Sequence, residues 1–177
     1  MRKNKLAATI VLAAALLAGC NPTYNWRDYS SPDAPYRVMF PAKPASHTRS
    51  VDLGGNKVEM TMTAAEVEGV MFAVGTGLAA DAAGAQAAVD AMKTAMLRNI
   101  GASVQRESAS AASSGDPERA RKIIDIEATG SGNGGPMRLT GHFESRGKRF
   151  YQVIVLGKAK ALSPEQTEQF MKSFTLL

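Results

Sequence analysis

The segment LGGNKVEMTMT, residues 53–63, decides the fold of this chain because it joins a tight turn to an alternating strand. The Gly-Gly-Asn run at 54–56 tolerates the positive φ angles that the turn of a β-hairpin requires. From residue 58 to 63, apolar and polar residues alternate with a period of two, which is typical of a strand buried on one side. The segment therefore predicts an antiparallel hairpin in which one face of the second strand belongs to a core.

Further strands are predicted on both sides of this hairpin. A strand ended by Pro41 precedes it, and a second turn at 66–69 follows it. Between residues 82 and 100 the apolar side chains recur every three or four residues, which indicates an amphipathic helix that ends at Gly101. The strands predicted before this helix are residues 36–40, 46–53, 58–63 and 70–78.

The second half of the chain also places strands before a helix. A weak strand and a loop are predicted within residues 102–118, and the glycine-rich stretch 129–136 is predicted to be a flexible connection. The last helix has clear start signals, because Ser163 can cap it, Pro164 suits its first position and Gln166 completes a capping box. The other strands predicted in this half are residues 120–128, 137–144 and 149–156.

Strands that are segregated from the helices and joined by tight turns predict an α+β fold. We expect an antiparallel sheet of about six or seven strands with helices packed on it, in a single α+β domain over residues 36–177. Apolar residues make up 45% of the 177 residues, which is enough for one domain with a core of its own.

The first 20 residues have the pattern of an export signal. Three cations occur among the first five residues, and residues 6–17 are an apolar run that is too short to span a bilayer. Small residues at 18 and 19 then lead to Cys20, and small side chains suit the position that a signal peptidase cleaves. This pattern predicts a secretory signal that is removed from the mature protein.

The run Leu17-Ala18-Gly19-Cys20 resembles the lipobox of bacterial lipoprotein signal peptides at all four positions. This resemblance implies that residues 1–19 are removed as a signal peptide. It also implies that Cys20 becomes the first residue of the mature protein and carries a diacylglyceryl thioether, with further acylation of its amino group. Because Asn21 and not Asp follows the cysteine, the resemblance favours the outer membrane, facing the periplasm, over the inner membrane.

Residues 20–35 are predicted to form the lipidated N-terminus and a tether, because prolines and small polar residues are frequent there. Tyr24, Trp26 and Tyr29 interrupt this composition. Two alternatives are open for these aromatic side chains. They either pack back on the domain or lie at the membrane interface, where Trp and Tyr are favoured.

A second resemblance covers the domain from residue 36 to 177. It rests on the stretches YRVMFPAKP at 36–44, RFYQVIVLG at 149–157 and FMKSF at 170–174. These stretches look like those of uncharacterised bacterial proteins and lipoproteins related to the PsbP-like fold. The resemblance implies a central antiparallel sheet with helices on both faces, an α-β-α sandwich. PsbP proteins act as assembly or stabilising subunits, but a fold does not carry a function by itself.

Charge and cysteine content argue against two classes of protein. The formal net charge is +5, but three of these charges belong to the export signal, so the remaining chain is nearly neutral. So small an excess does not indicate nucleic-acid binding. With Cys20 as its single cysteine, the chain forms no internal disulfide.

Few side chains in the sequence are candidates for catalysis or metal binding. The two histidines are His47 and His142, and His142 lies on a predicted strand. Asp125 and Glu127 share one face of another strand, so a neighbouring His142 would complete a trio for cation binding or acid–base work. A solvated sheet face is the plainer interpretation, because no local motif joins a nucleophile, a base and a group that orients the base. We predict no catalytic residue, no metal site and no cofactor, and Cys20 is the one predicted site residue.

The sequence thus predicts a membrane-anchored lipoprotein of the cell envelope that is not an enzyme. Its domain would bind or stabilise a partner protein of the envelope, and no nucleic acid. Two alternatives stay open. The domain could instead be a hydrolase or a metal-dependent enzyme with a site near His142. It could also bind a small apolar or lipid ligand in a cavity between sheet and helix, lined by Met60, Met62, Met92 and Met96.

Overall fold

The computed structural model describes residues 23–112, 115–132 and 134–177. The predicted signal peptide and Cys20 lie outside the described residues. The described elements, in chain order, are β1 (Arg27–Ser30), β2 (Tyr36–Phe40), β3 (Ala45–Leu53), β4 (Asn56–Val67), β5 (Val70–Leu78), α2 (Ala82–Asn99), β6 (Ser103–Ala112), the 3-10 turn η2 (Pro117–Arg119), β7 (Arg121–Gly132), β8 (Gly135–Arg146), β9 (Arg149–Lys158), α3 (Pro164–Ser173) and β10 (Thr175–Leu176).

These strands form two antiparallel sheets. The main sheet has seven strands in the order β3-β4-β5-β9-β8-β7-β6, and a small sheet has the order β1-β2-β10. The main sheet confirms the predicted α+β fold with helices packed on an antiparallel sheet. The predicted strand 36–40 is β2, but it belongs to the small sheet, because Pro41 and Pro44 interrupt the chain between β2 and β3 and let it change layer.

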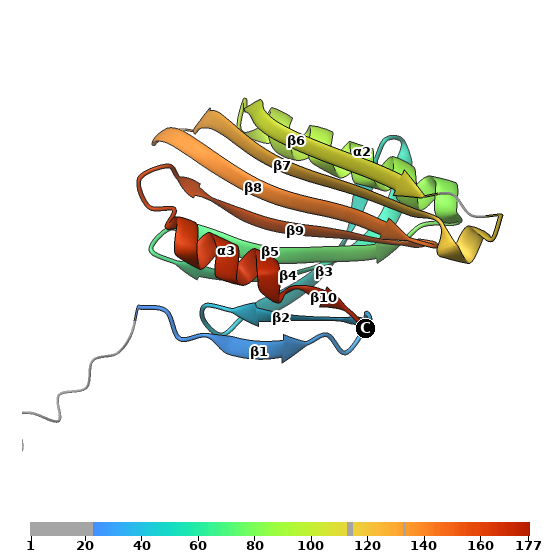
Figure 1. Cartoon of the computed structure of the whole chain (residues 1–177), viewed down its shortest axis with the longest axis horizontal. Helices are drawn as coiled ribbons and strands as arrows, with labels where there is room; N and C mark the ends of the chain where they lie inside the picture. The colour runs from blue at the N-terminus through green and yellow to red at the C-terminus, as the bar shows by residue number, and fades with distance from the viewer. Residues whose placement is uncertain (1–22, 113–114, 133) are drawn as a thin grey trace, which may run out of the picture.

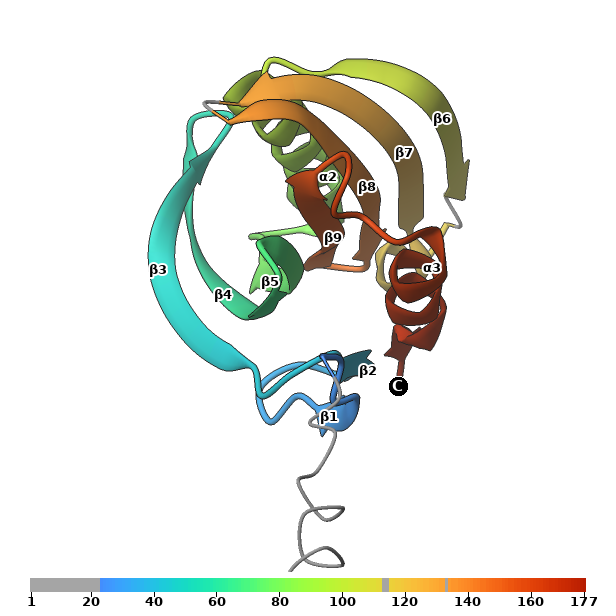
Figure 2. The same ribbon diagram turned by 90° about the vertical axis from the view of Figure 1, so that its left-hand side faces the viewer.

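The main sheet curves around α2, which lies on its concave side (Figure 2). The helix contacts β7, β8 and β9 from one half of the sheet and β3 from the other edge. Its small side chains let it approach the strands closely. The buried stripe of α2 has the predicted helical period and consists of Ala85, Ala88, Val89 and Met92.

On the opposite side of the main sheet, α3 and the small sheet cover the two central strands, β5 and β9 (Figure 1). Phe170 of α3 is fully buried, and its ring centre lies 5.4 Å from that of Phe72 and 5.5 Å from that of Phe40. These aromatic contacts tie the helix, β5 and β2 together. The two helices therefore lie on opposite faces of the main sheet, with a separate apolar core on each face.

The aromatic residues near the N-terminus pack back on the domain, which settles the two alternatives for them. The rings of Tyr24 and Trp26 lie edge-to-face against Phe72, with ring centres 6.4 and 6.2 Å apart. Trp26 Nε1 also donates a hydrogen bond to Gln166 Oε1 of α3 at 3.2 Å. The predicted tether over residues 20–35 is therefore too long, because β1 and these side chains are part of the folded domain.

The first hairpin turn forms where the sequence predicts it. Leu53 of β3 pairs with Asn56 of β4, and between them Gly54 and Gly55 have φ angles of 67° and 90°. Positive φ at both central positions gives the turn a twist that matches its strands. Glycine is the residue type that adopts this conformation without strain.

Residues 129–132 and 135–136 of the glycine-rich stretch belong to strands, so the prediction of a flexible connection is wrong for them. β7 continues to Gly132 and pairs there with Gly135, the first residue of β8. A Cβ atom at Gly130 would lie 2.3 Å from the carbonyl oxygen of Ile100 at the end of α2. The glycine at this position lets the strand pass directly beneath the end of the helix, so it serves close packing.

The last helix begins as predicted. Ser163 Oγ accepts a hydrogen bond from the backbone N–H of Gln166 at 3.4 Å, and Pro164 occupies the first turn. Phe174 follows the helix as its C-cap residue and is only half-buried. Its ring lies 5.7 Å from that of Tyr36 and 5.9 Å from that of Tyr151.

Phe170→Ala should lower the free energy of unfolding by about 3–5 kcal/mol, because removal of a fully buried ring leaves a cavity. Phe174→Ala should lower it by only about 1–2 kcal/mol, since less of this ring leaves water on folding. Urea denaturation followed by circular dichroism measures both losses. Equal losses for the two variants would contradict the docking of α3 described above.

Candidate functional site

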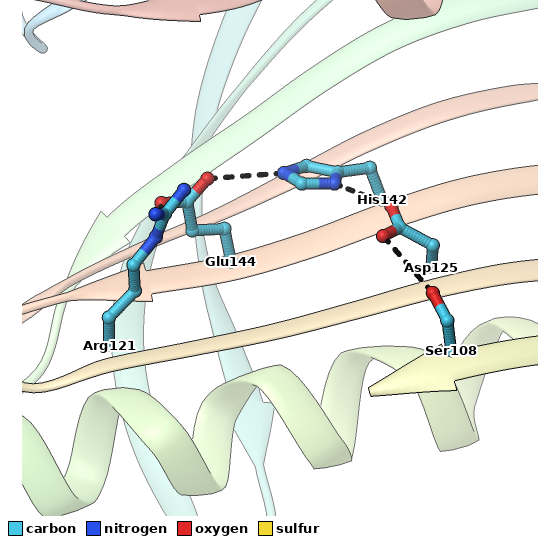
Figure 3. Close-up of polar contacts among 5 residues, drawn as sticks. All are labelled: Ser108, Arg121, Asp125, His142 and Glu144. Atoms are coloured by element: carbon cyan, nitrogen blue, oxygen red, sulfur yellow. Dashed lines mark hydrogen bonds and ion pairs between the residues drawn. The ribbon is translucent and has the colours of Figure 1, made fainter. Parts of the chain in front are cut away.

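His142 lies at the centre of a polar cluster (Figure 3), on the face of the main sheet that α3 partly covers. Its Nδ1 atom is 2.6 Å from Asp125 Oδ1, and its Nε2 atom is 3.2 Å from Glu144 Oε2. Asp125 is the residue of β7 directly opposite His142 on β8. Glu144 lies two residues further along β8 and therefore on the same face of the strand.

Arg121 and Ser108 extend the cluster at its two ends. Arg121 Nε donates to Glu144 Oε1 at 2.7 Å, and the Glu144 side chain is only 3% exposed. At the other end, Ser108 Oγ of β6 is 3.5 Å from Asp125 Oδ2. Figure 3 shows these side chains following one another across β6, β7 and β8.

The structure brings together only two members of the predicted trio. His142 and Asp125 are in contact, but Glu127 forms an ion pair with Arg106 of β6 at 3.2 Å instead. Glu144 takes the place that the sequence analysis gave to Glu127. The signal for Glu144 is its spacing of two residues from His142 on the same strand, which places both side chains on one face.

Two opposing influences act on the protonation of His142. Burial lowers its pKa, but hydrogen bonds and the negative charges of Glu144 and Asp125 outweigh burial, so the pKa of His142 is raised above its usual value. Burial likewise raises the pKa of Glu144, but His142 and Arg121 outweigh it and lower that pKa. These shifts favour a protonated imidazole beside an ionised Glu144.

In this geometry His142 has a structural role and not that of a general base. A protonated imidazole that donates from both ring nitrogens has no lone pair to accept a proton from a substrate. A cleft of about 460 Å³ lies beside the cluster, with Met171, Phe174 and Leu176 on its other wall. The cluster therefore links β7 and β8 by charge beside this cleft, and Ser108 adds a hydrogen bond from β6.

Among the described residues, no group of three or more His, Cys, Asp or Glu side chains is placed to hold a metal ion. In the same residues, no helix is both long and apolar enough to cross a membrane.

A second hollow, the methionine hollow, lies between α2 and the strands β3, β4 and β5. Its volume is about 590 Å³. The four methionines predicted to line a cavity all line it, together with Met71. These five residues are Met60, Met62, Met71, Met92 and Met96.

Gly75 of β5 makes room for these side chains. A Cβ atom at this position would lie 2.3 Å from Met60 Cε and 2.5 Å from Met62 Sδ. The two methionines of β4 can therefore extend over the neighbouring strand, where any other residue would push them aside. The flexible thioethers of Met60 and Met62 thus line the hollow above Gly75.

A few polar side chains border the methionine hollow. His47 and Arg49 lie at its outer edge on β3 and are exposed. Gln152 lines it from the central strand β9 and is only 5% exposed. Among the described residues, the Gln152 side chain makes no hydrogen bond.

Sequence reasoning missed Gln152, although a signal was present. Between residues 150 and 156 it is the one side chain able to form several hydrogen bonds in an otherwise apolar or aromatic run. The amide atoms of Gln152 are not fully buried, so they reach the hollow, and an amide of a central strand that bonds to no protein group invites an explanation.

Comparison with models of known protein families and with curated proteins finds no match for this chain. The resemblances to lipoprotein signals and to PsbP-like proteins therefore stay predictions.

His142→Gln should remove the part of the stability that depends on a protonated imidazole. Because folding raises the pKa of His142, this part is fully present below the ordinary histidine pKa of 6.5 and is lost as pH rises through the pKa of the folded state. The difference in melting temperature between wild type and His142→Gln should therefore be largest at about pH 5.5 and shrink as the solution becomes alkaline.

His47→Gln is the matched control, because His47 is exposed and forms no ion pair with a described residue. Its melting temperature should stay close to that of wild type, because the substitution breaks no ion pair. A His142→Gln difference that stays constant over the same pH range would contradict the ionic cluster.

Proposed function

We propose that this chain is a lipid-anchored protein of the bacterial cell envelope whose domain binds a small apolar or lipid ligand in the methionine hollow. The observation that carries the proposal is this hollow of about 590 Å³, lined by five methionines between α2 and the sheet. Sites for small molecules have volumes of roughly 300–1,000 Å³ and are mainly apolar, with a few polar groups. The methionine hollow meets each of these criteria.

The chemistry of methionine supports a binding role. Its side chain is unbranched and polarisable, so several methionines together adapt to ligands of different shape. Met60 and Met92 are buried, whereas Met62, Met71 and Met96 are half-buried and border the open part of the hollow. Ligand binding would remove the exposed apolar surface of these three side chains from water, which is favourable.

In this proposal the protein binds its ligand and catalyses no reaction. The alternative of a hydrolase or metal-dependent enzyme near His142 is less well supported, because both ring nitrogens of His142 lie against carboxylates. Ser108, the nearest hydroxyl of that cluster, contacts Asp125 and not the imidazole.

A second candidate function is assembly with a partner protein of the envelope. The observation that favours it is β6, an edge strand of the main sheet in which all ten residues are exposed. An exposed edge can accept a strand from another chain through backbone hydrogen bonds. Arg106 and Glu107 place charges on this edge, which discourages unspecific pairing.

Cys20→Ser should abolish lipid attachment, because the hydroxyl replaces the sulfur that would carry the diacylglyceryl group. Cells that express each form are fed an alkyne analogue of palmitate, and label on the purified protein is compared. Asn21→Ser, one residue further along, is the matched control and should keep its label. Equal labelling of the wild type and Cys20→Ser would contradict the proposed anchor.

Ala95→Phe should block the methionine hollow, because Ala95 lines it from α2 and a phenyl ring would occupy its volume. Full-length protein in lipid nanodiscs, labelled at the methionine methyl groups, is titrated with lauric acid and followed by NMR. In wild type, signals of the five hollow methionines should shift, and those of Met39, Met137 and Met171 should not. Ala95→Phe should weaken binding at least about tenfold, which corresponds to about 1.4 kcal/mol.

Ala87→Phe is the control for this experiment, because Ala87 is exposed on the same helix and does not line the hollow. It makes the same change in side chain and should bind lauric acid as wild type does. Shifts spread evenly over all methionines, or equal binding by both variants, would contradict a ligand site in the hollow.

A further inference from the structure

Four residues form a straight row across the sheet beneath the methionine hollow. His47 of β3 lies opposite Met62 of β4, Met62 lies opposite Gly75 of β5, and Gly75 lies opposite Gln152 of β9. Neighbouring strands are about 4.8 Å apart, so the row measures about 14 Å along the sheet. The hollow therefore has a polar group at its outer end, apolar groups in its middle and an amide at its inner end.

The amide of Gln152 is the most unusual feature of this row. It is 5% exposed, it lines the hollow, and it forms no hydrogen bond with a described residue. In the open hollow, water can satisfy its donors and its acceptor. A purely apolar ligand would displace that water and leave the amide unpaired, which is costly in an apolar site. A ligand with its own hydrogen-bonding group at this depth would avoid the cost.

The outer end of the row carries an arginine. Arg49 lies on the same face of β3 as His47, borders the hollow, and pairs with no carboxylate among the described residues. Asp52 is also at the rim, but it belongs to the other face of the strand and its Oδ1 accepts from the backbone N–H of Gly55 at 2.7 Å. An anionic head group at this edge would meet a free guanidinium.

We propose that the ligand of the methionine hollow is a single-chain amphiphile with an anionic head group at the β3 edge and a hydrogen-bonding group further along its chain that meets Gln152. This inference rests on the proposed function, since it names the ligand class of the same site. The head group is a carboxylate or a phosphate, both of which Arg49 can bind. The group that meets Gln152 is a hydroxyl or a carbonyl.

The test compares three ligands on the full-length protein in nanodiscs, again through its methionine methyl signals. They are lauric acid, ω-hydroxylauric acid, whose hydroxyl lies at the far end of the chain, and dodecanol, which lacks the anionic head. Each ligand is titrated against wild type and variants at the same lipid concentration. Partition of a ligand into the lipid is then the same for every variant and cancels in the comparison.

Gln152→Leu tests the inner end of the site. We expect this variant to lose about tenfold in affinity for ω-hydroxylauric acid and to bind lauric acid as tightly as wild type or more tightly. Gln152→Met, which keeps the length of the side chain, should give the same result. If both variants change the affinity for the two acids by the same factor, the inferred contact with Gln152 is wrong.

Arg49→Gln tests the outer end. It should weaken binding of both acids about two- to fivefold at low salt and leave dodecanol unaffected, because an exposed charge pair is weak and screened by ions. Arg138→Gln is the matched control, since Arg138 is an exposed arginine of β8 that does not line the hollow. If Arg49→Gln weakens binding of the two acids and of dodecanol by the same factor, the inferred anionic head group is wrong.

The outcomes separate this inference from the function on which it rests. Shifts of the five hollow methionines without any preference among the three ligands would leave the proposed function intact and overturn the ligand class. The absence of shifts with every ligand would overturn both.

Discussion

Both faces of the central strands β5 and β9 are apolar, and this constraint organises the rest of the molecule. In β9, Phe150 and Ile154 belong to the core on the α2 side, whereas Tyr151, Val153 and Val155 belong to the core on the α3 side. Because burial of apolar surface is the main source of stability, a strand of this kind needs a cover on each side. The helix α2 provides one cover, and α3 with the small sheet provides the other.

Each cover is narrower than the sheet beneath it. Seven strands span about 29 Å, whereas a helix with its side chains is about 10–12 Å wide. On the convex side the outer strands β6, β7 and β8 extend past α3, and their open face carries the ionic cluster around His142. On the concave side α2 contacts β3 and β7 to β9 but leaves β4 and β5 largely uncovered, and methionines occupy that space in part. Both hollows thus lie over strands that the nearest helix leaves largely uncovered.

The sequence predicted those features that depend on local chemistry. Gly54 and Gly55 specify a turn by their φ angles, and the alternation after them fixes which side chains of β4 face α2, so the methionine lining could be expected. Features that depend on distant partners were missed. β1 forms in a proline-rich stretch because Trp26 packs on Phe72, and Glu127 leaves the predicted trio because Arg106 lies within reach on β6. No local pattern encodes such pairings.

The packing of Tyr24 on Phe72 limits how far the domain can stand from a membrane. Four residues lead from Cys20 to Tyr24, and an extended chain spans at most about 3.6 Å per residue, so the span available is about 14 Å. A domain held by a lipid on Cys20, as proposed, would stay against the bilayer and could not cross the periplasm to deliver a ligand. It would exchange its ligand with the lipid beneath it or with a protein that comes to that surface, and so act as a resident receptor.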